Sequence, residues 1–423
     1  MSTTAAEFLE VADGLGAKLA RDAIWQGRQC NWTGDSMELL NGQWQVAHRA
    51  LGCELYSGTA GVALFLARLH QATRERLFAT LARGAAEQAF MHARALPPAV
   101  CSGFFSGQLG VAWSLVQLGH LLDAEDCVQQ GWDLLQPLFD ADLDQQGLDL
   151  TSGSAGAVGG LLSLAASPEL APGRRDALIE LARRHGLRLL ALARRSERGS
   201  HWSPEAAPGA SHGLCGFSHG ASGMACALQA LFGATQDPAF SQAGNEAWRY
   251  ERSWFNPQEQ NWPDLRSLYD PALDSAGQLT YMCAWCHGAP GIGFARLALH
   301  QAGNETDYLG DARAALSTTC RSLQGALSTG QGSFCLCHGL AGNAELLIEA
   351  SRLLDEPAHL ALAQQIGELG MHRYARSGAP WPCGVVGGGE TPSLMLGLAG
   401  IGWFYLRLHD PCMPSILAWP APP

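Results

Sequence analysis

The residues best suited to chemistry occur in short, matching stretches of this chain. Cys286-His287-Gly288 and Cys337-His338-Gly339 are each followed by a second glycine three residues after the first, and then by an apolar run. Ser218-His219-Gly220 has the same layout without the cysteine. Two thiolates and an imidazole are a donor set that zinc prefers, and three protein ligands leave a fourth position open, as in catalytic zinc sites. The pattern predicts a Zn²⁺ site formed by Cys286, Cys337 and His338.

The other residues of these stretches have alternative interpretations. His219 and His287 would be free for proton transfer, because imidazole titrates near neutral pH. A cysteine before a glycine turn is usually only a packed thiol, but two Cys-His-Gly units in register argue against that interpretation. Cys283 and Cys335 lie close enough in the sequence to be replacement ligands. The remaining cysteines are interpreted as small core residues: Cys30, Cys53, Cys101, Cys127, Cys215, Cys226, Cys320, Cys383 and Cys412.

The stretches belong to an internal repeat. Gly-x-x-Gly followed by an apolar run occurs seven times, and the repeats start at Ser57, Ser106, Ser152, His219, His287, His338 and Leu396. The apolar runs predict buried helices. Residues 76–96, 174–195 and 357–375 are amphipathic and predict a second helix within a repeat. β-Branched runs and hairpin turn pairs are scarce.

Seven pairs of one buried and one amphipathic helix predict an all-α fold, an α/α toroid of seven helical hairpin repeats. An open solenoid is the alternative, but special residues confined to the later repeats favour a closed ring. In such a ring, parallel buried helices bring their N-termini to one end, where helix dipoles favour thiolates. Residues 253–278 are predicted to form a long loop over the barrel mouth. Residues 1–423 are predicted to form a single domain.

Composition excludes several classes of protein. The chain has 47% hydrophobic and 16% charged residues, which argues against disorder, and its net charge of −12 provides no footprint for nucleic acid. No apolar run approaches the ~20 residues of a membrane span. The N-terminal residues are amphipathic and lack the apolar core of a signal peptide. We therefore expect a cytoplasmic protein that does not span a membrane, in which the cysteines do not form a disulfide framework.

Longer stretches carry a family resemblance. GFSHGASG, WCHGAPGIG, CHGLAGNAE and the closing LMLGLAGIGWFYLRLHDPCMPSIL resemble the lanthionine synthetase C-like cyclases, and most closely the cyclase half of the class II lanthipeptide synthetases. The resemblance covers the chain from about Leu51 to Leu417. It implies an α/α toroid with a zinc ion. It also implies a Michael-type addition, in which a peptide cysteine thiolate attacks dehydroalanine or dehydrobutyrine to form a lanthionine or methyllanthionine ring.

The resemblance assigns roles to individual residues. It implies that Cys286, Cys337 and His338 bind zinc and that His219 is a general acid or base. It also matches Asp149, which either orients His219 or serves only as a carboxylate near a helix N-terminus.

The sequence departs from the family pattern at two positions. Stand-alone cyclases have an arginine four residues before the first zinc cysteine, where this chain has Met282. Arg266 is the candidate to supply that cation from the preceding loop. The residue after the first zinc cysteine is often tyrosine in those cyclases and is His287 here, as in class II enzymes. Three aromatic residues are candidates to line the peptide site, although aromatics beside apolar helices more often belong to the core: Trp262, Tyr281 and Trp285.

The resemblance also implies partners. The substrate would be a dehydrated, ribosomally made precursor peptide, a separate dehydratase would produce the dehydro residues, and both enzymes could join a biosynthetic complex with a transporter. Three alternatives remain. They are intermolecular addition of a thiol such as glutathione, zinc-dependent prenyl transfer on a similar toroid, and a non-catalytic scaffold that binds a leader peptide or a partner enzyme. The absence of an evident diphosphate site argues against prenyl transfer.

Overall fold

The computed structural model describes residues 4–204, 210–268, 278–303 and 307–418. The chain divides into two compact units. The first unit comprises Met1–Pro97, Ser106–Asp140 and Leu323–Ser415, and the second comprises Pro98–Phe105, Ala141–Ser322 and Ile416–Pro423. Within the described ranges, no helix combines the length and the apolar character that crossing a membrane requires.

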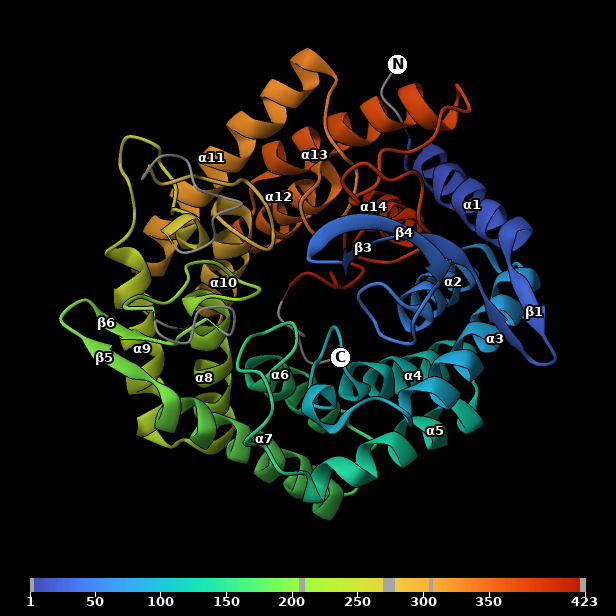
Figure 1. Ribbon diagram of the computed structural model, residues 1–423. Helices are drawn as coiled ribbons and strands as arrows, with labels where there is room; N and C mark the ends of the chain where they lie inside the picture. Colours follow the sequence, from blue (N-terminus) through green and yellow to red (C-terminus); the bar gives the residue numbers. More distant parts are fainter. Residues whose placement is uncertain (1–3, 205–209, 269–277, 304–306, 419–423) are drawn as a thin grey trace. The chain divides into compact units, whose positions relative to one another are not determined.

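Helix pairs make up the first unit (Figure 1). Its glycine-started helices are α2 (Thr59–Thr73), α4 (Gln108–Leu122), α12 (Leu340–Leu354) and α14 (Leu398–His409). Its other helices are α1 (Ala5–Asp22), α3 (Arg76–Ala93), α5 (Glu125–Leu135), the 3-10 helix η2 (Gln136–Asp140), α13 (Pro357–Gly370) and the π-helix η5 (Met371–Ala375). The helices α2 and α3, α4 and α5, and α12 and α13 pack as pairs, whereas α14 packs on α1 from the opposite end of the chain.

The second unit has the same construction. Its glycine-started helices are α6 (Ser154–Ala165), α8 (Ala221–Thr235) and α10 (Ala289–Gln301). Its other helices are η1 (Pro98–Val100), α7 (Pro172–Leu192), α9 (Pro238–Arg252), η3 (Leu265–Leu268) and α11 (Asp307–Thr329), which ends in the first unit. Helix α6 packs on α7, α8 packs on α9, and α8 lies between α6 and α10.

Glycine determines where each glycine-started helix begins. The first glycine of every motif is the N-cap residue, and the helix starts at the next residue. The second glycine lies directly against the loop before it: a Cβ on Gly342 would collide with the carbonyl oxygen of Leu336. At Gly288 the backbone is left-handed, with φ of +90°, a conformation that glycine adopts without strain. The predicted helix starts and the mostly helical fold are confirmed.

Backbone hydrogen bonds join the loops that precede neighbouring glycine-started helices. In the second unit, Phe105 N donates to Thr151 O (2.9 Å) and Leu150 N donates to Ser218 O (3.0 Å). The loops before α6 and α8 are therefore fixed relative to each other.

The first unit repeats this linkage across the two ends of the chain. Leu336 N donates to Met395 O (3.1 Å), and Met395 N donates to Tyr56 O (2.9 Å). These bonds join the loops of the sixth, seventh and first repeats, and α14 packs on both α12 and α2. The last repeat thus lies beside the first, as a closed arrangement requires and an open solenoid would not allow.

Within the described part of the chain, three β-hairpins lie outside the helical pattern. They pair β1 (Ile24–Gln26) with β2 (Gln29–Asn31), β3 (Thr33–Leu40) with β4 (Gln43–Ala50), and β5 (Arg194–Ser196) with β6 (Gly199–His201). The turn between β3 and β4 is Asn41-Gly42, and both residues have positive φ, which is the signature of a two-residue hairpin. This Asn-Gly signal is visible in the sequence, but the hairpin was not among the predicted elements.

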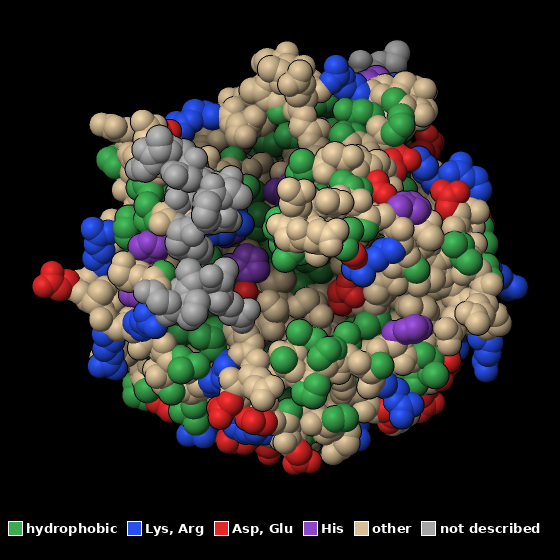
Figure 2. All heavy atoms as spheres, in the orientation of Figure 1, with side chains coloured by type: hydrophobic (Ala, Val, Ile, Leu, Met, Phe, Trp, Pro, Cys, Tyr) green, Lys and Arg blue, Asp and Glu red, His purple; other side chains and the backbone are tan. Residues whose placement is uncertain are grey.

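The predicted loop over residues 253–278 is only partly described. Residues 253–268 contain an antiparallel bridge between Asn256 and Asn261 and end in η3, and residues 269–277 lie outside the described part of the chain. The face drawn in Figure 2 carries Lys and Arg side chains in small groups interspersed with Asp and Glu, and not as one basic patch.

Two glycine substitutions should have opposite effects on stability. In Gly342→Ala, the new Cβ would collide with Leu336 O, so we expect a loss of about 1–3 kcal/mol in the free energy of unfolding. Gly325→Ala is the control, because Gly325 lies within α11 with open space around it and alanine should stabilise the helix by about 0.5–1 kcal/mol. Urea denaturation measures both. Equal effects would contradict the close approach of the motif to its loop.

Candidate functional site

The sequence-predicted site residues are divided between the two units. The second unit contains Asp149, His219, Arg266, Cys286 and His287, and the first unit contains Cys337 and His338. In both units, these residues lie on the loops that lead into glycine-started helices, or close to those loops.

Asp149 and His219 form a hydrogen-bonded pair in the second unit. His219 Nδ1 lies 2.6 Å from Asp149 Oδ2, and Asp149 Oδ1 accepts hydrogen bonds from the backbone N (2.7 Å) and Oγ (3.1 Å) of Ser152. Asp149 precedes α6 and His219 precedes α8, so the bond between their loops brings the two side chains together. A proton on Nδ1 that is held by the carboxylate leaves Nε2 for proton exchange.

The pair shifts the pKa of both partners. Burial raises the pKa of Asp149, but the hydrogen bond and the charge of His219, together with the hydrogen bonds from Ser152, outweigh burial and hold that pKa below its ordinary value. Burial lowers the pKa of His219, but Asp149 outweighs burial and raises that pKa overall. The carboxylate is 15% exposed and the imidazole is 39% exposed. His219 is therefore an accessible base whose protonated form is favoured.

His287 lies near this pair but has a different environment. Its ring centroid is 5.8 Å from that of His219, and only 2% of the residue is exposed. Burial lowers the pKa of His287 to about 4, and its Nδ1 has no hydrogen-bond partner among the described residues. His287 is thus a neutral imidazole at pH 7, which makes it a poorer proton donor than His219.

The segment containing Cys286 is anchored on both sides. Ser218 Oγ donates to Cys286 O (3.2 Å), and Trp285 Nε1 donates to Leu417 O (3.0 Å). The Trp285 ring makes edge contacts with Phe105 and Phe217. Trp285 is 0% exposed and serves as a core anchor for the segment.

The other two aromatic candidates also have structural partners. Trp262 is 0% exposed and packs on Phe255 with ring centroids 4.7 Å apart. Tyr281 accepts a hydrogen bond at its hydroxyl from Asn256 Nδ2 (2.8 Å). Of the two interpretations of Trp262 and Trp285, the structure supports the core one, because both rings are fully buried.

Arg266 reaches the side chain of Met282. Arg266 Nη2 lies 3.4 Å from Met282 Sδ, and its guanidinium pairs with Asp264 at 2.6 Å. Burial raises the pKa of Asp264, but the bond to Arg266 outweighs burial and lowers that pKa overall. The guanidinium therefore lies against the position where the family pattern has an arginine. Asp264 was not among the predicted site residues, although its place two residues before Arg266 is visible in the sequence.

Cys337 and His338 lie in the first unit, on the loop that leads into α12. Cys337 is buried, and a possible ligand atom of each residue lies within 4.8 Å of the other. His338 Nε2 lies 2.9 Å from Gly384 O, so Nε2 carries the proton and the lone pair is on Nδ1. A carbonyl that orients a histidine in this way is the usual outer-shell partner of a metal ligand. A thiolate and an Nδ1 lone pair held this close fit two positions of a zinc site.

The replacement ligands considered from the sequence have other contacts. Cys335 is fully buried, and its Sγ accepts a hydrogen bond from the backbone N of His338 (3.4 Å), which helps to shape the turn. Burial raises the pKa of the Cys283 thiol, and hydrogen bonds from Ser322 and Thr319 only partly offset this. Cys283 is therefore less suited to binding zinc as a thiolate.

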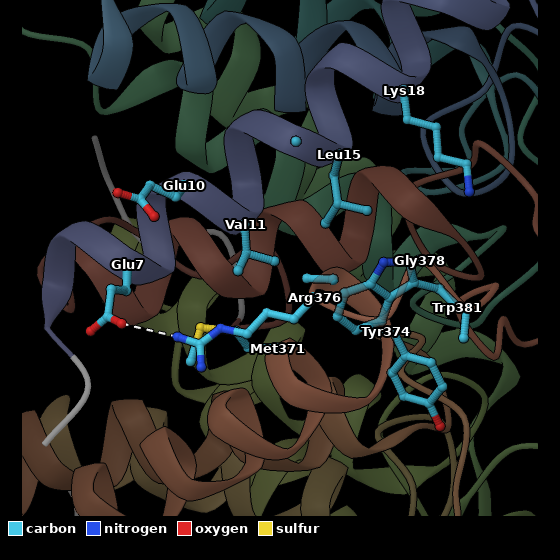
Figure 3. Close-up of a pocket in the computed structure, with 13 residues that line it drawn as sticks. Glu7, Glu10, Val11, Leu15, Lys18, Met371, Tyr374, Arg376, Gly378 and Trp381 are labelled. Atoms are coloured by element: carbon cyan, nitrogen blue, oxygen red, sulfur yellow. Dashed lines mark hydrogen bonds and ion pairs between the residues drawn. The ribbon is translucent and has the colours of Figure 1, made fainter. Parts of the chain in front are cut away.

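A separate surface pocket lies between α1 and η5 in the first unit (Figure 3). Its volume is about 320 Å³, and it is lined by apolar and charged side chains. Lys18 pairs with Glu390 and Arg376 pairs with Glu7, so both cations that line the pocket are paired within the protein. None of the sequence-predicted site residues lines it.

Comparison with known families identifies the chain. The model of the lanthionine synthetase C-like protein family matches residues 49–421. The chain belongs to this family. The matched range includes every residue that the sequence analysis assigned to the site.

Two curated proteins are similar to parts of this family member. Glutathione S-transferase LANCL1 of Danio rerio is 31% identical over 144 residues, which cover 34% of this chain and 32% of that protein. Lacticin 481/lactococcin biosynthesis protein LcnDR2 of Lactococcus lactis subsp. lactis is 25% identical over 202 residues, which cover 46% of this chain and 20% of that protein. The matches thus span about a third and a fifth of these relatives.

A solved structure establishes the fold of this family member. Nisin cyclase is similar with a TM-score of 0.61 and 17% sequence identity, over 85% of this chain and 89% of that one. Nisin cyclase is an α/α toroid, so the predicted fold class is confirmed.

The pair of Asp149 and His219 predicts a defined pH dependence. In Asp149→Asn we expect a lower pKa for His219, measured by NMR titration. The variant loses the carboxylate charge that raises this pKa, while burial still lowers it. The pair should stabilise the protein fully between the ordinary pKa of Asp, 3.8, and that of His, 6.5. This contribution is lost as pH falls through the lowered pKa of Asp149, or rises through the raised pKa of His219.

Denaturation of the wild type and Asp149→Asn across this range measures the stability difference. Asp126→Asn, which removes an exposed partner of Arg83, is the control and should leave the pKa of His219 unchanged. An unchanged pKa of His219 in Asp149→Asn would contradict the pairing.

Proposed function

We propose that this protein is a zinc-dependent cyclase that forms lanthionine and methyllanthionine rings in a dehydrated peptide. The hydrogen-bonded pair of Asp149 and His219, joined through Ser218 to the segment of Cys286, is the observation that carries the proposal. Membership of the lanthionine synthetase C-like family and the similarity to part of a lacticin biosynthesis protein support it.

The proposed metal ligands are Cys286, Cys337 and His338. Their convergence on one ion is part of the proposal. It is supported by the donor types and by the Gly384 carbonyl, which accepts a hydrogen bond from Nε2 of His338 and so orients the ring. Zinc bound there would keep a peptide cysteine deprotonated at neutral pH, well below the ordinary thiol pKa of about 8.5.

His219 is the proposed proton donor. When the cysteine sulfur bonds to Cβ of the dehydro residue, the electron pair of the double bond moves to Cα and the neighbouring carbonyl, and a proton must reach Cα. The raised pKa of His219 and its exposed ring suit it to give that proton from Nε2. The proton that the thiol loses balances the one that His219 gives, so the reaction is a net addition.

Arg266 is proposed to stabilise the negative charge that develops at the carbonyl. Its contact with Met282 Sδ supports this role, because the guanidinium lies where the family pattern provides a cation from position 282. Preorganised positive groups of this kind often contribute a large part of catalysis.

The partners follow from the proposed reaction. The substrate is a ribosomally made precursor peptide whose serine and threonine residues have been dehydrated, and we propose that a separate dehydratase performs that step. We further propose a cytoplasmic location and a biosynthetic complex with a transporter.

A second candidate is intermolecular thiol addition to dehydro residues. The similarity to part of a protein named glutathione S-transferase LANCL1 favours it, and it would use the same residues. A dehydrated peptide with one cysteine, incubated with glutathione, separates the two candidates. Cyclisation removes the peptide thiol without changing the mass, whereas addition increases the mass by one glutathione and leaves the peptide thiol intact.

Removal of a cysteine ligand should abolish both zinc binding and ring formation. In Cys286→Ala and Cys337→Ala we expect less than one tenth of the wild-type zinc and activity, with an unchanged helical circular dichroism spectrum, because two protein ligands hold zinc poorly. Cys412→Ala is the control, because Cys412 is exposed. In His219→Ala, zinc should remain and the rate should fall by about 10²–10⁴-fold. A Cys286→Ala variant with full zinc and activity would refute the ligand assignment.

An arginine at position 282 should restore the activity that is lost when Arg266 is replaced. In Arg266→Gln we expect the ring-closure rate to fall on the order of 10²-fold, as for loss of other groups that stabilise a developing oxyanion. Met282→Arg in the same chain should restore at least a tenth of the wild-type rate, since the two side chains contact each other. Thermal denaturation of both variants controls for the loss of the pair with Asp264. If the double variant is folded and no faster than Arg266→Gln, the role of Arg266 is not that of a cation at this position.

A further inference from the structure

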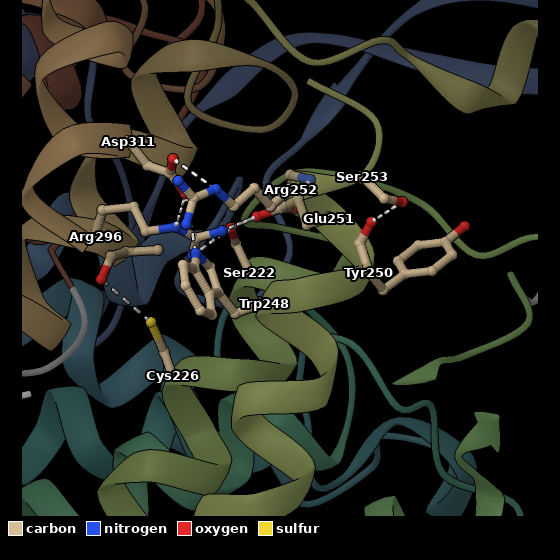
Figure 4. Close-up of polar contacts among 11 residues, drawn as sticks. Ser222, Cys226, Trp248, Tyr250, Glu251, Arg252, Ser253, Arg296 and Asp311 are labelled. Atoms are coloured by element: carbon tan, nitrogen blue, oxygen red, sulfur yellow. Dashed lines mark hydrogen bonds and ion pairs between the residues drawn. The ribbon is translucent and has the colours of Figure 1, made fainter. Parts of the chain in front are cut away.

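Glu251 and Arg296 form a fully buried ion pair in the second unit (Figure 4). Glu251 lies on α9 and Arg296 on α10, both side chains are 0% exposed, and Arg296 Nη2 lies 2.6 Å from Glu251 Oε2. Arg296 Nε lies 3.4 Å from Asp311 Oδ2. Removing two charges from water is costly, and apolar residues of similar volume often stabilise a core at least as well. Packing alone therefore does not account for this pair.

The carboxylate of Glu251 connects the pair to the loop before α8. Gly216 N donates to Glu251 Oε1 (2.8 Å), and Ser222 Oγ donates to Oε2. Arg296 thus holds one oxygen of Glu251 while the other oxygen holds the backbone of Gly216.

Gly216 lies directly against the candidate site. Its backbone is left-handed, with φ of +107°, and a Cβ built on it would lie 3.1 Å from Cys286 O. Two residues later, Ser218 bonds to Cys286 O, and His219 follows with its bond to Asp149. Residues 216–219, named here the histidine segment, are therefore anchored by Glu251 at one end and by Asp149 at the other.

The α2–α3 pair makes the corresponding link between its helices without charge. Thr59 at the start of α2 bonds to Gln88 of α3, whereas Ser154 at the start of α6 meets both His185 and the guanidinium of Arg188 on α7. A neutral side chain is thus sufficient to join a glycine-started helix to its partner. In the α8–α9 pair, Ser222 at the start of α8 bonds instead to the carboxylate of Glu251 on α9. The loop before α8 is the one that carries His219.

We infer that Glu251 is a positioning residue that fixes the histidine segment against Cys286, with Arg296 holding its carboxylate in one orientation. Its catalytic consequence rests on the proposed function, but its effect on the loop does not. The inference assigns the hydrogen bond to Gly216 N as the contact through which Glu251 acts.

Two double variants separate this bond from the charge. Glu251→Leu/Arg296→Met removes both charges and the acceptor of Gly216 N, and Glu251→Gln/Arg296→Met removes the charges but keeps an amide oxygen as acceptor. Thr59→Val/Gln88→Leu is the matched control in the first unit, since it removes an equivalent link at a loop that carries no assigned residue. Hydrogen–deuterium exchange of the peptide containing residues 214–219, zinc content, kcat and KM are measured for all three.

For the leucine variant we expect at least tenfold faster exchange at residues 214–219, and about a 10–100-fold lower kcat with KM unchanged, because a small displacement of a reacting group has effects of this size. The glutamine variant should recover wild-type exchange and most of kcat, and the control should match the wild type in both. Wild-type exchange in the leucine variant, or an equal loss of kcat in the control, would overturn the inference. A wild type that forms no rings would refute the proposed function, and the exchange data would still test the positioning.

Discussion

The close fit of each Gly-x-x-Gly motif against the loop before it is the constraint on which the rest of the structure depends. A side chain on Gly342 or on Gly400 would collide with a carbonyl oxygen six residues earlier. Each loop therefore enters the helix that follows it in the same way. Backbone bonds such as that from Leu150 to Ser218 then align neighbouring loops. Chemistry can be placed on this frame by changing only the residue next to a glycine, as His219 and His338 illustrate.

The electrostatics of the second unit separate two histidines that are similar in sequence. His219 and His287 precede equivalent glycines and lie 5.8 Å apart, yet Asp149 raises the pKa of the first and burial lowers that of the second to about 4. Neighbouring groups with divergent pKa values are typical of acid–base sites. The arrangement supports the proposed proton transfer by His219, with His287 as a neutral neighbour.

The sequence predicted what the repeat determines and missed what tertiary contacts determine. The family resemblance implied Asp149 as a possible partner of His219, and the helix starts follow from motif register. The role of α1 as the partner of α14 does not, because these helices lie at opposite ends of the chain. Buried ion pairs such as Asp264 with Arg266 and Glu251 with Arg296 produce no repeating pattern in the sequence. The sequence left open whether Trp285 lines the site or belongs to the core, because core and lining aromatics have the same sequence context; the structure encloses its ring.

The central claim is that two cysteines and one histidine of this chain hold a zinc ion with one position left for a substrate thiol. X-ray absorption at the zinc edge tests it most directly, on the full-length protein before and after addition of a cysteine-containing peptide. The account predicts two sulfur ligands at about 2.3 Å and nitrogen or oxygen ligands near 2.0 Å, and a third sulfur when the peptide is present. A folded protein without zinc, or a sulfur count that the peptide does not change, would contradict it.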